Sequence, residues 1–97
     1  MMRDEYPTQN VRTAWRVYDG QAVILSPDDS MLNTLNPVGT LIWEAADGRT
    51  PVSAIVARIC AAFEVDPARA ERDAAAFIAK LCQRGLLTVL DTPAQAP

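Results

Sequence analysis

Residues 31–48 read MLNTLNPVGTLIWEAADG, and they predict a short strand that runs directly into a capped helix. Asn36 can accept a hydrogen bond at the start of the helix, and Pro37 suits the first helical position, where no N–H is needed. We therefore expect a strand over residues 31–35 and a helix over residues 37–46, with almost no loop between them.

Two further strands are predicted before this segment. Residues 13–18 carry aromatic and β-branched side chains, and residues 21–25 read QAVIL. Asp19-Gly20 lies between them and is a strong hairpin signal, because both central positions of the turn take a positive φ. Together with residues 31–35, these runs predict an antiparallel meander of three strands.

Two more helices are predicted downstream, and each opens with a capping residue followed by proline. Thr50-Pro51 begins a helix over residues 51–64, and Asp66-Pro67 begins another over residues 67–84. Apolar side chains recur in both at helical spacing, which is typical of helices that pack on a core. With residues 86–90 as an extended finish, the order predicts an α+β fold, a three-stranded antiparallel sheet followed by three helices.

The composition fits one globular domain without a catalytic constellation. The chain has 97 residues, of which 49% are hydrophobic, enough for a modest core. It contains no histidine, which removes the commonest general base and every His-ligated metal site. Cys60 and Cys82 are expected to pack as small core residues, with a disulfide between them as the alternative. We therefore expect no enzymatic activity, no cofactor and no metal.

The charge balance argues against a nucleic-acid partner. Nine basic and twelve acidic residues give a formal net charge of −3, whereas nucleic-acid binders usually present a basic face. No apolar run is long enough to cross a bilayer, and no secretion signal opens the chain, so we expect a cytoplasmic protein without a membrane partner. The expected organisation is a flexible N-terminal arm over residues 1–10, a domain over residues 11–90 and a flexible C-terminal tail over residues 91–97.

Several residue pairs at characteristic spacing resemble the PqqD family. This family includes the small protein of pyrroloquinoline quinone (PQQ) biosynthesis and the related recognition elements of ribosomally made, modified peptides (RiPPs). The resemblance covers about residues 14–88 and implies a compact, non-catalytic domain of winged helix-turn-helix type. The residues that carry it are Asp19-Gly20, Leu35-Asn36, Ile42-Trp43, Asp47-Gly48, the helix over residues 50–63 and the closing stretch from Leu81 to Leu87.

The resemblance also implies a partner and a binding mode. Members of this family bind the leader region of a precursor peptide and present it to a modifying enzyme, often a radical S-adenosylmethionine (radical SAM) enzyme. The leader adds as a further strand beside the third strand, in a groove walled by the third helix. A DNA-binding transcriptional regulator with a winged helix is the alternative, although neither of the last two helices is strongly basic.

Strand addition needs an edge strand with free backbone groups, and residues 31–35 lie at the edge of the predicted meander. On the third helix, a stripe of four residues lies beside the buried side chains: Arg69, Asp73, Ala76 and Lys80. An ordinary solvated helix face explains the same stripe, and the resemblance is what favours a binding wall. The candidate peptide-binding residues are therefore Met31, Leu32, Asn33, Thr34, Leu35, Arg69, Arg72, Asp73, Ala76, Phe77 and Lys80.

The helix side chains suggest what a leader could carry. Ala76 is small and would leave room for an apolar side chain. Arg69, Arg72 and Lys80 could meet acidic leader residues, while Asp73 could meet a basic one. Other possible occupants of the edge are the chain's own N-terminal arm, residues 86–90, and a second copy of the chain in a homodimer.

Overall fold

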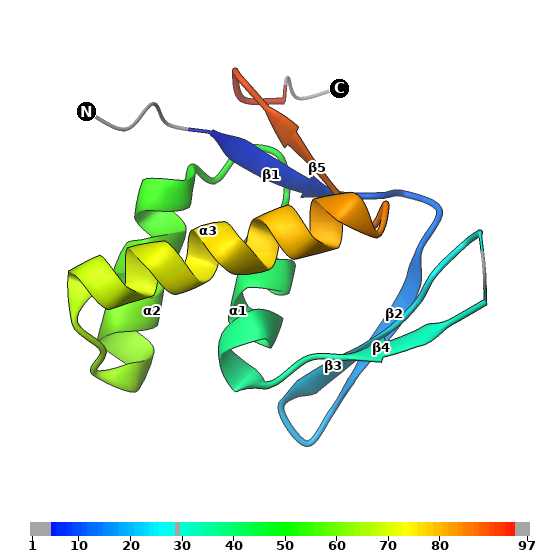
Figure 1. Cartoon of the computed structure of the whole chain (residues 1–97), viewed down its shortest axis with the longest axis horizontal. Helices are drawn as coiled ribbons and strands as arrows, with labels where there is room; N and C mark the ends of the chain where they lie inside the picture. The colour runs from blue at the N-terminus through cyan, green and yellow to red at the C-terminus, as the bar shows by residue number, and fades with distance from the viewer. Residues whose placement is uncertain (1–4, 29, 95–97) are drawn as a thin grey trace.

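The computed structural model describes residues 5–28 and 30–94, and within them it shows three helices and two small antiparallel sheets (Figure 1). The predicted α+β class, with three consecutive helices after an antiparallel sheet, is confirmed. In chain order the elements are β1 (Tyr6–Gln9), β2 (Ala14–Tyr18), β3 (Gln21–Leu25), β4 (Leu32–Thr34), α1 (Pro37–Ala45), α2 (Val52–Phe63), α3 (Pro67–Gln83) and β5 (Leu87–Leu90).

Strands β2, β3 and β4 form the predicted meander, with β3 in the middle. Asp19 and Gly20 have φ angles of +52° and +76°, as the predicted tight turn requires. Ala22 and Ile24 of β3 are fully buried, so one face of this sheet packs on the core. The third strand is shorter than predicted, because β4 covers only residues Leu32–Thr34.

Strands β1 and β5 form a second sheet that the sequence does not predict in full. The sequence predicts a loose arm over residues 1–10, but within it Tyr6–Gln9 pair with Leu87–Leu90 at the other end of the chain. The opposite edge of β1 is also held, since the Pro7 carbonyl accepts a hydrogen bond from the Gly48 N–H at 2.9 Å. Both segments are therefore occupied with each other in a separate sheet, and neither pairs with β4.

Two of the three predicted helix caps are confirmed. Asn36 and Asp66 each accept a hydrogen bond from the backbone N–H three residues ahead, at the start of α1 and α3. The predicted cap at Thr50 is wrong, because the Asp47 carboxylate accepts the Thr50 N–H at 2.8 Å and the Thr50 hydroxyl at 3.2 Å. Thr50 therefore belongs to the preceding turn, and α2 begins at Val52.

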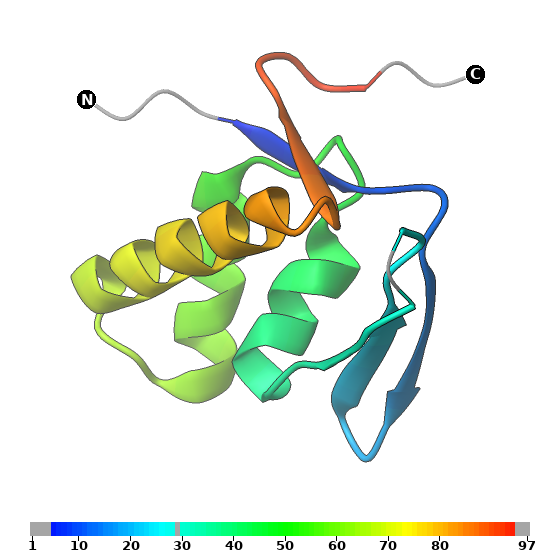
Figure 2. The same ribbon diagram turned by 45° about the vertical axis from the view of Figure 1, so that its right-hand side comes forward.

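The core lies where α1 packs against both the β2–β3–β4 sheet and α3 (Figure 2). Trp43 of α1 is fully buried there, and the ring of Trp15 from β2 meets it edge-on at a centroid distance of 5.9 Å. Thr40 joins α1 to the sheet, since its Oγ1 accepts the Ala22 N–H at 2.8 Å. The buried face of α3 consists of Ala70, Ala74, Ile78 and Leu81.

Both cysteines pack against this core as free thiols. Cys60 and Cys82 are each half-buried beside the buried apolar cluster. None of the helices formed by the described residues has the length and apolarity that a membrane crossing requires.

Candidate functional site

The free edge of β4 is the centre of the candidate site. β4 pairs with β3 on one side, and in the described part of the chain no strand pairs with its other side. The two residues that flank β4 in the chain form backbone hydrogen bonds in the direction of β3. The Met31 carbonyl accepts the Ser26 N–H, and the Leu35 N–H donates to the Ala22 carbonyl. Because such bonds alternate along an antiparallel strand, Asn33 also bonds to β3, whereas Leu32 and Thr34 direct their N–H and C=O groups to the free edge.

The side chains of β4 alternate between the two faces of the sheet. Asn33 lies opposite the fully buried Ile24, so its side chain points to the helical side. Leu32 lies opposite Leu25 on the outer face and is 67% exposed. A strand added to this edge would therefore direct alternate side chains towards the helices and towards solvent.

The C-terminal half of α3 contacts β4 at Arg84 and the start of α1 at Phe77. Arg84, directly after α3, donates from Nη1 to Oδ1 of Asn33 at 2.7 Å. Earlier on the helix, the Phe77 ring lies against Gly39 at the start of α1, shortly after β4 ends. These contacts place the end of α3 beside β4 and Phe77 beside the helix that follows β4, and in Figure 1 the C-terminal end of α3 points to the side of the molecule where β2, β3 and β4 lie.

The predicted stripe on α3 lies close to the flank that carries Phe77. Arg69, Asp73, Ala76 and Lys80 are all exposed, and helical spacing places them between the outward side of α3 and the flank that carries Phe77. Arg69 forms an ion pair with Asp73 one turn away, at 3.7 Å. Within residues 5–28 and 30–94, Lys80 forms no ion pair, so it is the uncompensated charge of the stripe.

Arg72 lies at the border of the stripe, three residues after Arg69 and four before Ala76, on the side away from Phe77. It lines a shallow hollow with Ala68, Glu71 and Ala75. By helical spacing this hollow lies on the other flank of α3, away from Phe77 and β4. The structure thus brings Arg84 to Asn33 of β4 and Phe77 to the start of α1, whereas a binding role for the stripe and for Arg72 stays a prediction.

Arg84 is the site residue that the sequence prediction missed. It falls seven positions after Phe77, two helical turns further along the same flank, which is the spacing that could have identified it. The contact with Asn33 depends on how α3 crosses the sheet, and helical spacing alone does not give that crossing.

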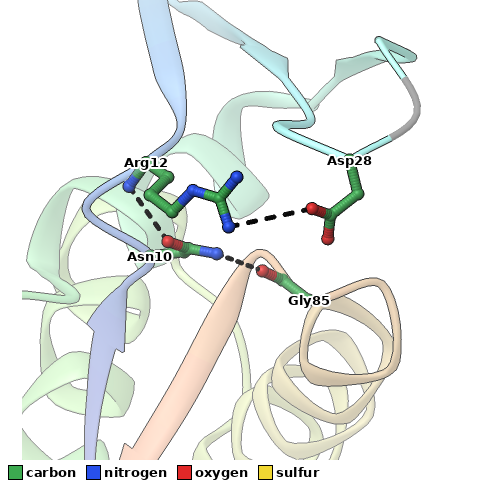
Figure 3. Close-up of polar contacts among 4 residues, drawn as sticks. All are labelled: Asn10, Arg12, Asp28 and Gly85. Carbon is green, nitrogen blue, oxygen red and sulfur yellow. Dashed lines mark hydrogen bonds and ion pairs between the residues drawn. The ribbon is translucent and has the colours of Figure 1, made fainter.

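A network of polar contacts holds the turn after α3 in place (Figure 3). The Asn10 side chain donates to the Gly85 carbonyl at 2.9 Å and accepts the Arg12 N–H, also at 2.9 Å. Arg12 in turn lies 3.9 Å from Asp28, in the connection between β3 and β4. The Arg12–Asp28 pair is exposed and contributes little energy, whereas the Asn10–Gly85 hydrogen bond ties the turn after α3 to the segment that follows β1.

The Asp47 turn lies outside this site and shows the clearest electrostatic effect. Partial burial tends to raise the pKa of the Asp47 carboxyl, but hydrogen bonds from the N–H groups of Arg49 and Thr50 and from the Thr50 hydroxyl outweigh it. The pKa of Asp47 is therefore lowered, and the carboxylate is a structural acceptor that holds the turn between α1 and α2.

Solved structures with the same fold include two at modest sequence identity. One is TbiB1 in complex with the TbiA(beta) leader peptide, with 28% identity, a TM-score of 0.75 and coverage of 82% of this chain and 93% of that chain. Another is the PqqD truncation of Methylobacterium extorquens PqqCD, described as a functional, stand-alone RiPP recognition element, with 25% identity, a TM-score of 0.70 and coverage of 84% and 87%.

A third structure shares the fold alone: lasso peptide synthetase B1 complexed with the leader peptide, at 23% identity, with a TM-score of 0.72 and coverage of 84% of this chain and 96% of that chain. No curated protein matches the sequence. The family described as coenzyme PQQ synthesis protein D (PqqD) matches residues 21–87, which is most of the chain. This chain therefore belongs to the PqqD family.

Proposed function

We propose that this protein binds the leader region of a ribosomally made precursor peptide as an added strand at the free edge of β4. The observation that carries the proposal is the pair of residues Leu32 and Thr34, whose backbone groups point away from β3, on a strand that Arg84 contacts from the end of α3. Support comes from the similar structure of TbiB1, which is described as a complex with a leader peptide.

Backbone pairing alone gives too little affinity. Leu32 and Thr34 together offer two N–H and two C=O groups, each worth about 0.5–1.5 kcal/mol net once paired. Immobilising the peptide costs about 4 kcal/mol or more, so the surplus must come from side chains. Burial of one apolar leader side chain against the Phe77 flank contributes about 1.5–3 kcal/mol. The edge therefore holds the peptide as an extended strand, and side-chain contacts supply its register and selectivity.

The proposed role is that of a non-catalytic adaptor in the cytoplasm. It would present the bound leader to a radical SAM enzyme or another peptide-modifying enzyme, in the biosynthesis of PQQ or a related peptide-derived product. Within residues 5–28 and 30–94, no three acidic or cysteine side chains gather into a group that could hold a metal ion. In this proposal the enzyme that receives the leader carries out the chemistry.

Proline substitution tests the binding mode. Thr34→Pro removes an N–H on the free edge but leaves the β3–β4 hydrogen bonds in place. Val17→Pro is the matched control. Val17 lies opposite Ala22, and the Ala22 carbonyl accepts its hydrogen bond from Leu35, away from β2. The Val17 N–H therefore points away from β3, at the opposite edge of the same sheet.

The probe is a set of labelled, overlapping synthetic peptides that cover the short reading frames beside the gene. We expect at least one to bind with micromolar or tighter affinity, and Thr34→Pro to weaken it by about tenfold or more. Val17→Pro should leave the affinity unchanged. Absence of binding by every peptide, or equal binding to Thr34→Pro and the parent protein, contradicts the proposal.

A further inference from the structure

We infer that Arg84 selects leaders that carry an acidic residue. In the leader sequence, this acidic residue lies two positions after an apolar one. The inference rests on the proposed function and adds the chemical class of peptide that this edge accepts. It starts from the contact between Arg84 and Asn33.

Arg84 has unused capacity to bind an anion. Its guanidinium carries five N–H donors, and its contact within the described residues is the 2.7 Å hydrogen bond from Nη1 to Asn33. The ion pairs found in residues 5–28 and 30–94 are Arg12–Asp28 and Arg69–Asp73, so no described carboxylate neutralises Arg84. The side chain is exposed, and its remaining donors are therefore available to a ligand.

An added strand would bring one of its side chains to this guanidinium. Asn33 directs its backbone groups to β3, so an antiparallel guest residue opposite it forms a non-hydrogen-bonded pair. In such a pair the two side chains share a face, with Cβ atoms about 4.5–5.5 Å apart. Since Arg84 already reaches the Asn33 side chain, a guest Asp or Glu at this position lies within reach of the same guanidinium.

The next guest position on the inner face has different surroundings. The next inward residue is Leu35, which directly follows β4 and is buried, and the Phe77 ring packs on Gly39 four residues further on. In an antiparallel strand, the guest residue opposite Leu35 precedes the one opposite Asn33 by two positions. The expected leader pattern is therefore apolar, any residue, acidic, read from N- to C-terminus.

Charge on the α3 flank agrees with this pattern. Arg69 and Asp73 compensate each other, whereas Lys80 and Arg84 are one turn apart and lack a described acidic partner. Cations near a helix C-terminus also stabilise the helix, but that role does not discriminate between acidic and neutral peptides. A double-mutant cycle between protein and peptide separates the two roles.

The experiment uses the peptide that binds best in the tiling assay. Each Asp is changed to Asn and each Glu to Gln, and every variant is titrated against the parent protein, Arg84→Gln and Arg72→Gln. Arg72 is the matched control because it is an exposed arginine of the same helix that helical spacing places about 120° around the axis from Arg84. Thermal unfolding checks that both protein variants keep the fold.

At one acidic position of the peptide, the neutral substitution should weaken binding to the parent protein and to Arg72→Gln by about fivefold. The same substitution should weaken binding to Arg84→Gln much less. That coupling should shrink at high ionic strength. The inference fails if Thr34→Pro abolishes binding but no acidic position couples to Arg84. Failure of the proposed function gives a different result, either no binding peptide at all or binding that ignores Thr34→Pro.

Discussion

The Phe77 ring lies so close to Gly39 that a Cβ at residue 39 would be 2.9 Å from its Cε1 and 3.0 Å from its Cζ. A glycine therefore stands at this point of α1 to let α3 approach the end of β4. The contact brings the flank of α3 next to the candidate site.

Gly39→Ala should destabilise the protein although alanine favours helices. The clash is expected to cost about 1–3 kcal/mol, against a gain in helix propensity of about 1 kcal/mol. In a Phe77→Leu background the ring atoms at the contact are gone, and the same substitution should become neutral or stabilising. Urea unfolding of the four proteins measures the cycle, and a Gly39→Ala protein more stable than its parent would contradict this account of the contact.

Thr40→Val tests the link between α1 and β3. The hydroxyl accepts the buried Ala22 N–H, and valine leaves that donor without a partner, at a cost of about 1–3 kcal/mol. Thr40→Ser keeps the acceptor and should recover much of the loss. The free energy of unfolding in urea distinguishes them, and equal losses in both variants would show that the hydrogen bond is not the cause.

Asp47 should contribute stability that depends on pH. Its pKa is lowered in the folded state, so the stabilisation is fully present above the unfolded pKa of about 4 and is lost as pH falls through the lower, folded value. The melting temperature of the parent protein should therefore exceed that of Asp47→Asn near neutral pH, and the gap should close in acid. A gap that widens as pH falls would contradict the assignment.

Cys82 should react slowly with alkylating reagents. Burial raises the pKa of its thiol, and the negative charge of Glu5 raises it further. Glu5→Gln should speed the modification of Cys82 at a fixed, mildly alkaline pH, as measured by mass spectrometry of the modified peptide. An unchanged rate would show that Glu5 does not influence the thiol.

Local signals in the sequence account for most elements of the fold. The Asp19-Gly20 turn and the caps at Asn36 and Asp66 depend on neighbours within a few residues, and the structure contains all three. The pairing of β1 with β5 joins Tyr6 to Leu90, and a four-residue strand that contains proline shows no clear alternation of apolar side chains. Such a long-range pair leaves almost no local signal.

For the candidate site too, local features can be predicted from the sequence, whereas long-range contacts cannot. The edge position of β4 follows from the order of three short strands, and the structure contains that order. Helical spacing gave the stripe on α3 but not the neighbour that it faces, since that depends on how the helix crosses the sheet. Composition and charge group Arg72 with the stripe, although its side chain lines a hollow on the side of α3 away from Phe77. The contact between Arg84 and Asn33 spans 51 positions, so no local pattern indicates it.

Hydrogen exchange at the amides of β4 tests strand addition most directly. In the free protein the Leu32 and Thr34 amides should exchange fast, while the Asn33 amide is already protected by β3. A saturating leader peptide should slow exchange at Leu32 and Thr34 by about tenfold or more and leave Val17, on the opposite edge, unchanged. A peptide that binds tightly without slowing exchange at Leu32 and Thr34 would contradict the account.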